Sequence, residues 1–143
     1  MQNDIVQILH TAEEIQAKVR ELGAAISRDY EGRNPLLICV LKGAFIFIAD
    51  LARSITIPVE LDFMAVSSYG NAARSSGEVK IVKDLDTPVE GRDVVVVEDI
   101  IDSGLTLSYL IDVLERRNAR SVRVVALFDK PSRRTIDFKP DYV

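Results

Sequence analysis

Histidine, cysteine and tryptophan are scarce in this sequence, which has one histidine, one cysteine and no tryptophan among its 143 residues. A single cysteine forms no intrachain disulfide, and Cys39 lies within the apolar run 36–41, where a buried thiol is expected. The lone His10 leaves no Ser-His-Asp triad and no histidine-rich metal site. These scarcities exclude a disulfide scaffold, zinc chemistry and triad hydrolysis.

The sequence also lacks a surplus of positive charge and any long apolar run. Its formal net charge is −4, whereas a protein whose main work is to hold nucleic-acid phosphates needs excess lysine and arginine. No apolar run approaches the ~20 residues that span a bilayer, and residues 1–9 do not resemble a secretory signal. We therefore expect a cytoplasmic protein that is not a membrane protein and whose main partner is not nucleic acid.

Hydrophobic residues make up 48% of the chain and charged residues 28%, which is typical of a globular protein. A chain of this length buries roughly 70% of the surface that its unfolded form exposes, so one domain can hold a sizeable core. No repeat or linker interrupts the pattern. We expect a single domain over residues 1–143.

Helical and strand patterns alternate along the chain. Thr11 and Glu14 form a capping box that opens an amphipathic helix over 11–28. The apolar run 36–41 predicts a strand buried on both faces. The other expected elements are a helix at 44–53, strands at 59–67, 79–85, 94–97 and 122–128, and a helix from 107 onward. This order predicts an α/β fold, an open, mostly parallel twisted sheet that binds ligands beyond the carboxyl ends of its strands.

A polar segment separates the strands expected at 59–67 and 79–85. Residues 67–78 read SSYGNAARSSGE, a stretch rich in serine, glycine and asparagine. It is too long for a tight hairpin and too polar to be buried. We therefore expect a mobile flap there.

The segment 94–106, VVVVEDIIDSGLT, carries the strongest chemical signal. Glu98 and Asp99 follow a β-branched strand and can accept hydrogen bonds from hydroxyls or bind Mg²⁺. Neighbours on a strand point to opposite faces, so the two acids are not equivalent. Asp102 to Thr106 then turn into a helix, whose free N–H groups, glycine and hydroxyls suit a phosphate.

Other interpretations of this segment explain less of it. A P-loop nucleotide site needs G-x-x-x-x-G-K-[ST], and a dinucleotide site needs G-x-G-x-x-G; neither pattern occurs. A helix cap by Asp102 or Ser103 alone would account for one side chain. It leaves the acid pair unexplained, so the pattern favours a site for a phosphorylated sugar.

The thirteen residues 94–106 resemble the ribose-phosphate signature of type I phosphoribosyltransferases, in which four apolar residues, two acids, two further residues, Asp-Ser/Thr-Gly, a variable residue and Thr follow in order. Three further stretches resemble segments of the hypoxanthine-guanine members. Residues 41–44 are similar to the pyrophosphate loop, residues 67–70 to the closing loop, and residues 138–142 to the purine-binding segment. The implied fold is the Rossmann-like sheet of this family, with helices on both faces and a flexible antiparallel flap.

The resemblance implies roles for the residues of the signature. Glu98 and Asp99 would hold the ribose hydroxyls of 5-phosphoribosyl 1-pyrophosphate (PRPP) and a Mg²⁺ ion. Asp102 would also act as general acid/base at N7 of a purine. The 5′-phosphate would be held by Asp102, Ser103, Gly104, Leu105 and Thr106.

The other three stretches imply roles as well. Lys42 and Gly43 would meet pyrophosphate, with a cis peptide bond just before Lys42. Ser68 and Tyr69 would close over the reacting centre. Lys139 would donate to the 6-oxo group of the base, which favours hypoxanthine, guanine or xanthine over adenine.

The resemblance therefore implies a purine-salvage enzyme that makes IMP or GMP and pyrophosphate, with Mg²⁺ as cofactor, as a homodimer or homotetramer. The family usually continues past the position of Val143 with a stretch that stacks an aromatic ring on the purine and adds another metal-site aspartate. The missing base-capping segment leads us to expect either a fragment or a purine site completed in another way.

Two other functions stay open. A non-catalytic regulator could bind phosphoribosyl compounds, and RNA through its arginines, although the acid pair, Asp102 and the flap favour an enzyme. A phosphoribosyltransferase for another base is disfavoured by the segment around Lys139. We expect most of the basic residues to complement a helix end or to lie in solvated or subunit-contact surface: Arg116, Arg117, Arg120, Arg123, Lys130, Arg133 and Arg134.

Overall fold

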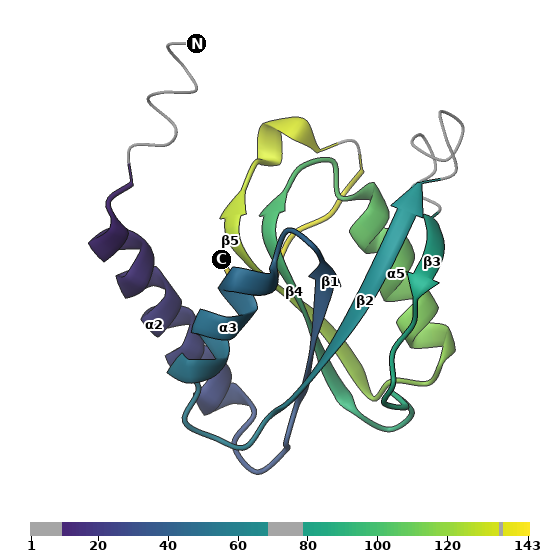
Figure 1. Ribbon diagram of the computed structural model, residues 1–143, viewed down its shortest axis with the longest axis horizontal. Helices are drawn as coiled ribbons and strands as arrows, with labels where there is room; N and C mark the ends of the chain where they lie inside the picture. Colours follow the sequence, from purple (N-terminus) through teal and green to yellow (C-terminus); the bar gives the residue numbers. More distant parts are fainter. Residues whose placement is uncertain (1–9, 69–78, 135) are drawn as a thin grey trace.

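The computed structural model describes residues 10–68, 79–134 and 136–143. Five strands form one sheet in the order β3-β2-β1-β4-β5 (Figure 1). Among the four strand pairs of this described sheet, β2 with β3 is antiparallel and the other three are parallel. The strands are β1 (Leu36–Leu41), β2 (Glu60–Ser68), β3 (Val79–Lys83), β4 (Asp93–Ile101) and β5 (Ser121–Asp129). The predicted mostly parallel α/β sheet is confirmed.

Helices cover both faces of the sheet, as predicted. α2 (Ala12–Asp29) and α3 (Phe45–Ser54) pack on one face, and α5 (Leu105–Arg116) packs on the other (Figure 1). A short 3₁₀ helix, η1 (Pro131–Arg133), follows β5. The start of α2 matches the capping signal, because the Thr11 side chain accepts a hydrogen bond from the Glu14 N–H at 3.0 Å.

The central strands β1 and β4 explain the uninterrupted apolar runs in the sequence. In a strand, successive side chains point to opposite faces. Leu37 and Cys39 of β1 therefore pack under α2 and α3, while Leu36 and Ile38 pack under α5. All four are fully buried. A strand covered by helices on both faces has no exposed side to fill with polar residues.

The fourth strand is longer than the sequence pattern indicated. Its valines were predicted as a strand over 94–97, but β4 continues to Ile101 because it stays paired with β5 as far as Asp129. On its other side, β4 pairs with β1 only up to the register of Cys39 and Val97. The last residues of β4 thus have a strand neighbour on one side only, and both acids of the motif lie in this half-open end.

The predicted flap lies outside the described residues, apart from Ser67 and Ser68 at the end of β2. The strands on either side of it are antiparallel, as expected, and β3 ends at Lys83 rather than at residue 85. Within the described ranges, no helix combines the length and the apolar character that a bilayer crossing requires.

Candidate active site

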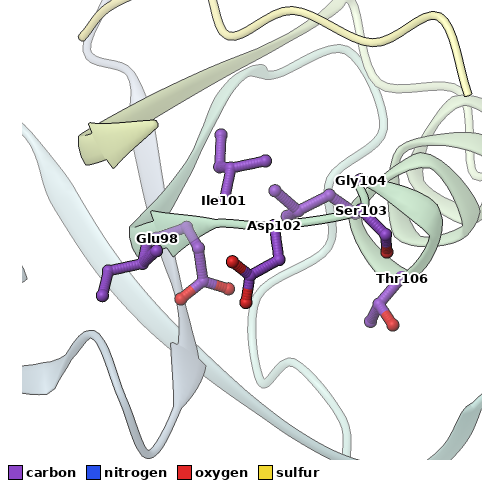
Figure 2. A pocket seen from close by; sticks show the side chains of 8 residues that line it. Glu98, Ile101, Asp102, Ser103, Gly104 and Thr106 are labelled. Atoms are coloured by element: carbon purple, nitrogen blue, oxygen red, sulfur yellow. The ribbon is translucent and has the colours of Figure 1, made fainter. Parts of the chain in front are cut away.

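A pocket of about 250 Å³ opens where β4 turns into α5 (Figure 2). The carboxyl groups of Glu98 and Asp102 extend to the same side of the chain, with Ser103 and Thr106 on the helix side of them (Figure 2). The pocket is lined by Glu98, Ile100, Ile101, Asp102, Ser103, Gly104, Thr106 and Leu107. It lies beyond the carboxyl end of a central strand, where ligands bind in such sheets.

The turn into α5 depends on Gly104, which caps the helix with φ 83° and ψ −5°. This left-handed conformation favours glycine. A Cβ at this position would also lie 3.1 Å from Phe138 Cβ and 3.2 Å from Arg134 Cδ. The Ser103 hydroxyl accepts a hydrogen bond from the Leu105 N–H at 3.3 Å. The first N–H groups of a helix have no intrahelical acceptors and carry partial positive charge, so this turn suits an anion.

The pKa of the Glu98 carboxyl group, which lies in the pocket at the turn into α5, is shifted by its surroundings. Burial raises its pKa to about 8, and the neighbouring carboxyls of Asp99 and Asp102 act in the same direction. The Asp99 N–H, which donates to Glu98 Oε1 at 3.1 Å, opposes the shift. The Glu98 carboxyl therefore holds its proton to a higher pH than an ordinary glutamate does. A cation or a set of hydroxyl donors would relieve this crowding of acids.

Asp99 is not among the described residues that line the pocket, and its carboxyl lies beside the loop after β1. A Cβ on Gly43 would lie 3.3 Å from Asp99 Oδ1, and Oδ1 also accepts a hydrogen bond from the Ile100 N–H at 2.8 Å. The two acids are thus not equivalent, as the strand geometry predicted. The peptide bond between Leu41 and Lys42 is cis, as the family resemblance implied.

The structure places five of the predicted residues in the lining of one pocket. Glu98, Asp102, Ser103, Gly104 and Thr106 share one pocket. Its lining, as far as the chain is described, does not include Lys42, Gly43, Asp99, Leu105 or Lys139. Tyr69 and the side chain of Ser68 lie outside the described part of the chain.

Comparison with known proteins assigns the chain to a family. Residues 6–143 match the family model described as the phosphoribosyl transferase domain. This chain belongs to the phosphoribosyltransferase family. It is 57% identical over its whole length to the hypoxanthine-guanine phosphoribosyltransferase of Bacillus subtilis, of which it covers 79%.

The chain is also 56% identical to the bifunctional protein TilS/HprT of Listeria monocytogenes, and it spans only 22% of the length of that relative. Among solved structures, a hypoxanthine-guanine phosphoribosyltransferase from Bacillus anthracis superposes with a TM-score of 0.92 at 47% identity. That comparison covers 94% of this chain and 80% of the other. The Bacillus anthracis structure has a HEPES molecule in its active site.

The C-terminal segment of this phosphoribosyltransferase domain is anchored along β5. Tyr142 forms a parallel bridge with Val125, and the Asp141 carboxylate accepts a hydrogen bond from the Val124 N–H at 2.8 Å. Upstream, Phe138 packs against the position of Gly104. Lys139 lies between these two contacts with an exposed side chain. Its proposed contact with the base stays a prediction.

Two basic residues that were expected on the surface lie next to the site. The Lys130 N–H donates to the Ile101 carbonyl at 3.0 Å, which places Lys130 beside the end of β4. The Arg134 guanidinium donates to the Asp102 carbonyl at 2.8 Å. No local pattern marks these residues, because only the pairing of β4 with β5 brings them to Asp102.

The arginines around the end of α5 have polar partners. Their guanidinium groups meet acidic or hydroxyl partners in the same region of the molecule. The pairs are Arg116 with Asp112, Arg117 with Asp84, Arg120 with Asp93, and Arg123 with the Tyr142 hydroxyl. The three arginines that pair with carboxylates, Arg116, Arg117 and Arg120, attract nucleic-acid phosphates less than unpaired arginines would.

Proposed function

We propose that this domain is a hypoxanthine-guanine phosphoribosyltransferase that transfers the phosphoribosyl group of PRPP to N9 of a 6-oxopurine. The bond from C1′ to pyrophosphate breaks as the bond from C1′ to N9 forms, giving IMP or GMP and pyrophosphate. The observation that carries this proposal is the single pocket shared by Glu98, Asp102 and the start of α5. The names of the relatives support purine salvage.

The 5′-phosphate would occupy the turn formed by Ser103, Gly104, Leu105 and Thr106. The hydroxyls of Ser103 and Thr106 and the N–H groups of the helix start would donate to the phosphate. The described residues that line the pocket include no lysine or arginine. Glu98 would accept hydrogen bonds from the ribose hydroxyls on the same side. This arrangement holds the sugar between the acid and the helix.

Asp102 is the proposed general acid/base. Its carboxyl lies in the pocket beside Glu98 and next to the turn that would hold the phosphate. From there it would hold a proton at the purine N7 while N9 becomes bonded to the sugar. Such proton transfer typically contributes 10²–10⁴-fold to a rate.

The acids fit a magnesium ion that arrives with the substrate. In the described ranges, no three histidine, cysteine, aspartate or glutamate side chains form a metal cluster. Mg²⁺ usually binds one or two carboxylates together with substrate oxygens and water, which Glu98 and Asp99 can supply. When bound, the ion would neutralise charge on the departing pyrophosphate.

The remaining roles complete the proposal. Lys42 and Gly43 would meet pyrophosphate from the loop beside Asp99, and Ser68 with Tyr69 would close over the pocket. Lys139 would read the 6-oxo group of hypoxanthine, guanine or xanthine. The action of residues 1–143 as a single domain and the cytoplasmic location stay predictions.

Self-association into a dimer or tetramer is also part of the proposal. Phe45 and Ile46 at the start of α3 are 56% and 63% exposed. Two neighbouring apolar side chains exposed at one helix start support a subunit contact there.

Pyrophosphate release from PRPP tests the proposed function directly. The chain, and a version extended at its C-terminus, would be assayed with hypoxanthine, guanine, xanthine and adenine, with and without Mg²⁺. We expect release with 6-oxopurines only, and only with Mg²⁺. Adenine as the best substrate would point to another base specificity.

The regulator hypothesis has its own test. Salt-sensitive RNA retention on filters by the same preparation, with no pyrophosphate release by either version, would favour an RNA-binding regulator. The ion pairs of the arginines argue against that outcome.

A further inference from the structure

Arg134 lies behind the phosphate turn rather than in the pocket. Its side chain is only 10% exposed, and it is not one of the described residues that line the pocket. Its Cδ lies 3.2 Å from the position that a Cβ on Gly104 would take. Burying a guanidinium is costly unless its donors are satisfied. The hydrogen-bond partners of Arg134 therefore explain why it can be buried beside Gly104.

The donors of Arg134 are satisfied by two different strand ends. One terminal nitrogen donates to the Asp102 carbonyl at 2.8 Å, at the end of β4. The other pairs with the carboxylate of Asp129, the last residue of β5, whose side chain is 17% exposed. The guanidinium also lies over the Phe138 ring, 5.7 Å from its centroid. Arg134 thus joins β4, β5 and the C-terminal segment behind the turn.

The bond to the Asp102 carbonyl has a geometric consequence for the pocket. A trans peptide is planar, and its C=O and N–H groups point in opposite directions. With the Asp102 oxygen held on Arg134, the N–H of Ser103 must point away from Arg134. Asp102 and Ser103 line the pocket while Arg134 does not, so this N–H turns toward the side where an anion would bind.

We infer that Arg134 is a positioning residue that fixes the Asp102–Ser103 peptide plane for phosphate binding, and that Asp129 holds Arg134 in place. This inference rests on the proposed function for the identity of the ligand, PRPP. An arginine suits the role because its planar fork reaches two acceptors at once and its face packs on an aromatic ring. A lysine has one nitrogen and no such face.

Two single variants, their combination and a control variant test the inference. Arg134→Met keeps an unbranched apolar side chain against Phe138 but removes the donors, and Asp129→Asn keeps the shape of the partner without its charge. Arg133→Met, an exposed neighbour in η1, is the matched control. We expect Arg134→Met to raise the KM for PRPP about tenfold or more, with a smaller change in the KM for the purine. The double variant with Asp129→Asn should be no worse than Arg134→Met alone.

Amide hydrogen exchange in the ligand-free protein provides a readout that does not depend on activity. Arg134→Met should speed exchange in the peptide containing Ser103 to Leu105, while Arg133→Met should leave it unchanged. If Arg134→Met does not fold, Asp129→Asn carries the same test with the arginine still present. Unchanged exchange in that peptide and an unchanged KM for PRPP in a folded variant would overturn the inference. Absence of pyrophosphate release by the wild-type chain would instead refute the proposed function, and the exchange result would still stand.

Discussion

Glu98 is proposed to bind substrate, but its environment in the site lowers the stability of the folded protein. Its carboxyl is crowded by burial and by two other acids, which raise its pKa from 4.5 to about 8. Between these two values the unfolded chain ionises this group while the folded protein keeps it protonated. The folded state is therefore penalised as the pH rises from about 4.5, and the penalty is complete above about 8.

Glu98→Gln should relieve that penalty while impairing the site. We expect the variant to be more stable than the wild type by on the order of 2 kcal/mol at pH 7, with the difference vanishing toward pH 4. Its affinity for PRPP should fall. Thermal unfolding at pH 4, 6 and 8 measures the first effect, with Glu115→Gln, an exposed glutamate on α5, as control. A difference that does not vary with pH would contradict the assignment.

Gly104 is the second residue whose environment leads to a prediction. Gly104→Ala must adopt φ 83° and bring its Cβ within 3.1–3.2 Å of Phe138 and Arg134. We expect a loss of about 2 kcal/mol or more in unfolding free energy, together with weaker PRPP binding.

Gly91→Ala is the matched control for this change. Gly91 has φ 72°, but a Cβ added there would meet no atom within 4 Å outside its chain neighbours. Gly91→Ala therefore has the same kind of backbone strain as Gly104→Ala but no crowding of the added Cβ. Gly91 is not among the described residues that line the pocket. Denaturant unfolding and PRPP titration of both variants separate the two effects. Equal losses of stability and unchanged PRPP affinity would show that crowding at the turn has no effect.

At the scale of elements, a buried carboxylate ties the loop after β3 to β2. Asp62 is 4% exposed, and it accepts hydrogen bonds from the N–H groups of Phe63 (2.8 Å), Asp86 (3.0 Å) and Thr87 (2.8 Å). Burial alone would raise the pKa of Asp62, but these hydrogen bonds outweigh it and lower the pKa below 3.8. The anchor therefore stabilises the fold above that pH and is lost as the pH falls through the lowered value.

Asp62→Asn should destabilise the protein at neutral pH by about 1–3 kcal/mol, because an amide cannot accept all three hydrogen bonds. The difference from the wild type should be full above pH 3.8 and should shrink as the pH falls through the lowered pKa of Asp62. Urea unfolding at pH 7 and at a series of values below pH 3.8 measures both, with Asp86→Asn as control, since the Asp86 side chain is 87% exposed. Equal stability of Asp62→Asn and the wild type at pH 7 would refute the anchor.

The elements themselves were largely predictable. The helix capped by Thr11, the buried strand 36–41 and the valine run of β4 all have local patterns that match their structures. The end of β4 was not predictable, because its last four residues are held in a strand by pairing with β5. The same non-local pairing brings Lys130 and Arg134 to Asp102, so local patterns alone left them on the surface.

At the scale of the whole molecule, the C-terminal segment packed along β5 carries Lys139, the residue proposed to contact the base. Lys139→Ala should raise the KM for guanine and hypoxanthine about tenfold while leaving that for PRPP nearly unchanged, because a lost hydrogen bond to the 6-oxo group affects only the base. Lys130→Ala is the comparator, since the backbone of Lys130 lies beside the end of β4. Weaker purine binding in Lys130→Ala, with purine binding unchanged in Lys139→Ala, would indicate that Lys130 rather than Lys139 contacts the base.

By itself, the sequence determined the α/β class, the strand-turn-helix that builds the pocket and the different environments of Glu98 and Asp99. These features follow from side-chain periodicity, from the left-handed preference of glycine and from the free N–H groups of a helix start, all of which act between near neighbours. Only the tertiary structure decided the pKa of Glu98, the contact of Asp99 with the Gly43 loop and the bond from Arg134 to Asp102. These three features depend on burial and on the order of the strands in the sheet. Neither can be predicted from the spacing of residues along the chain, because both arise from contacts between residues far apart in the sequence.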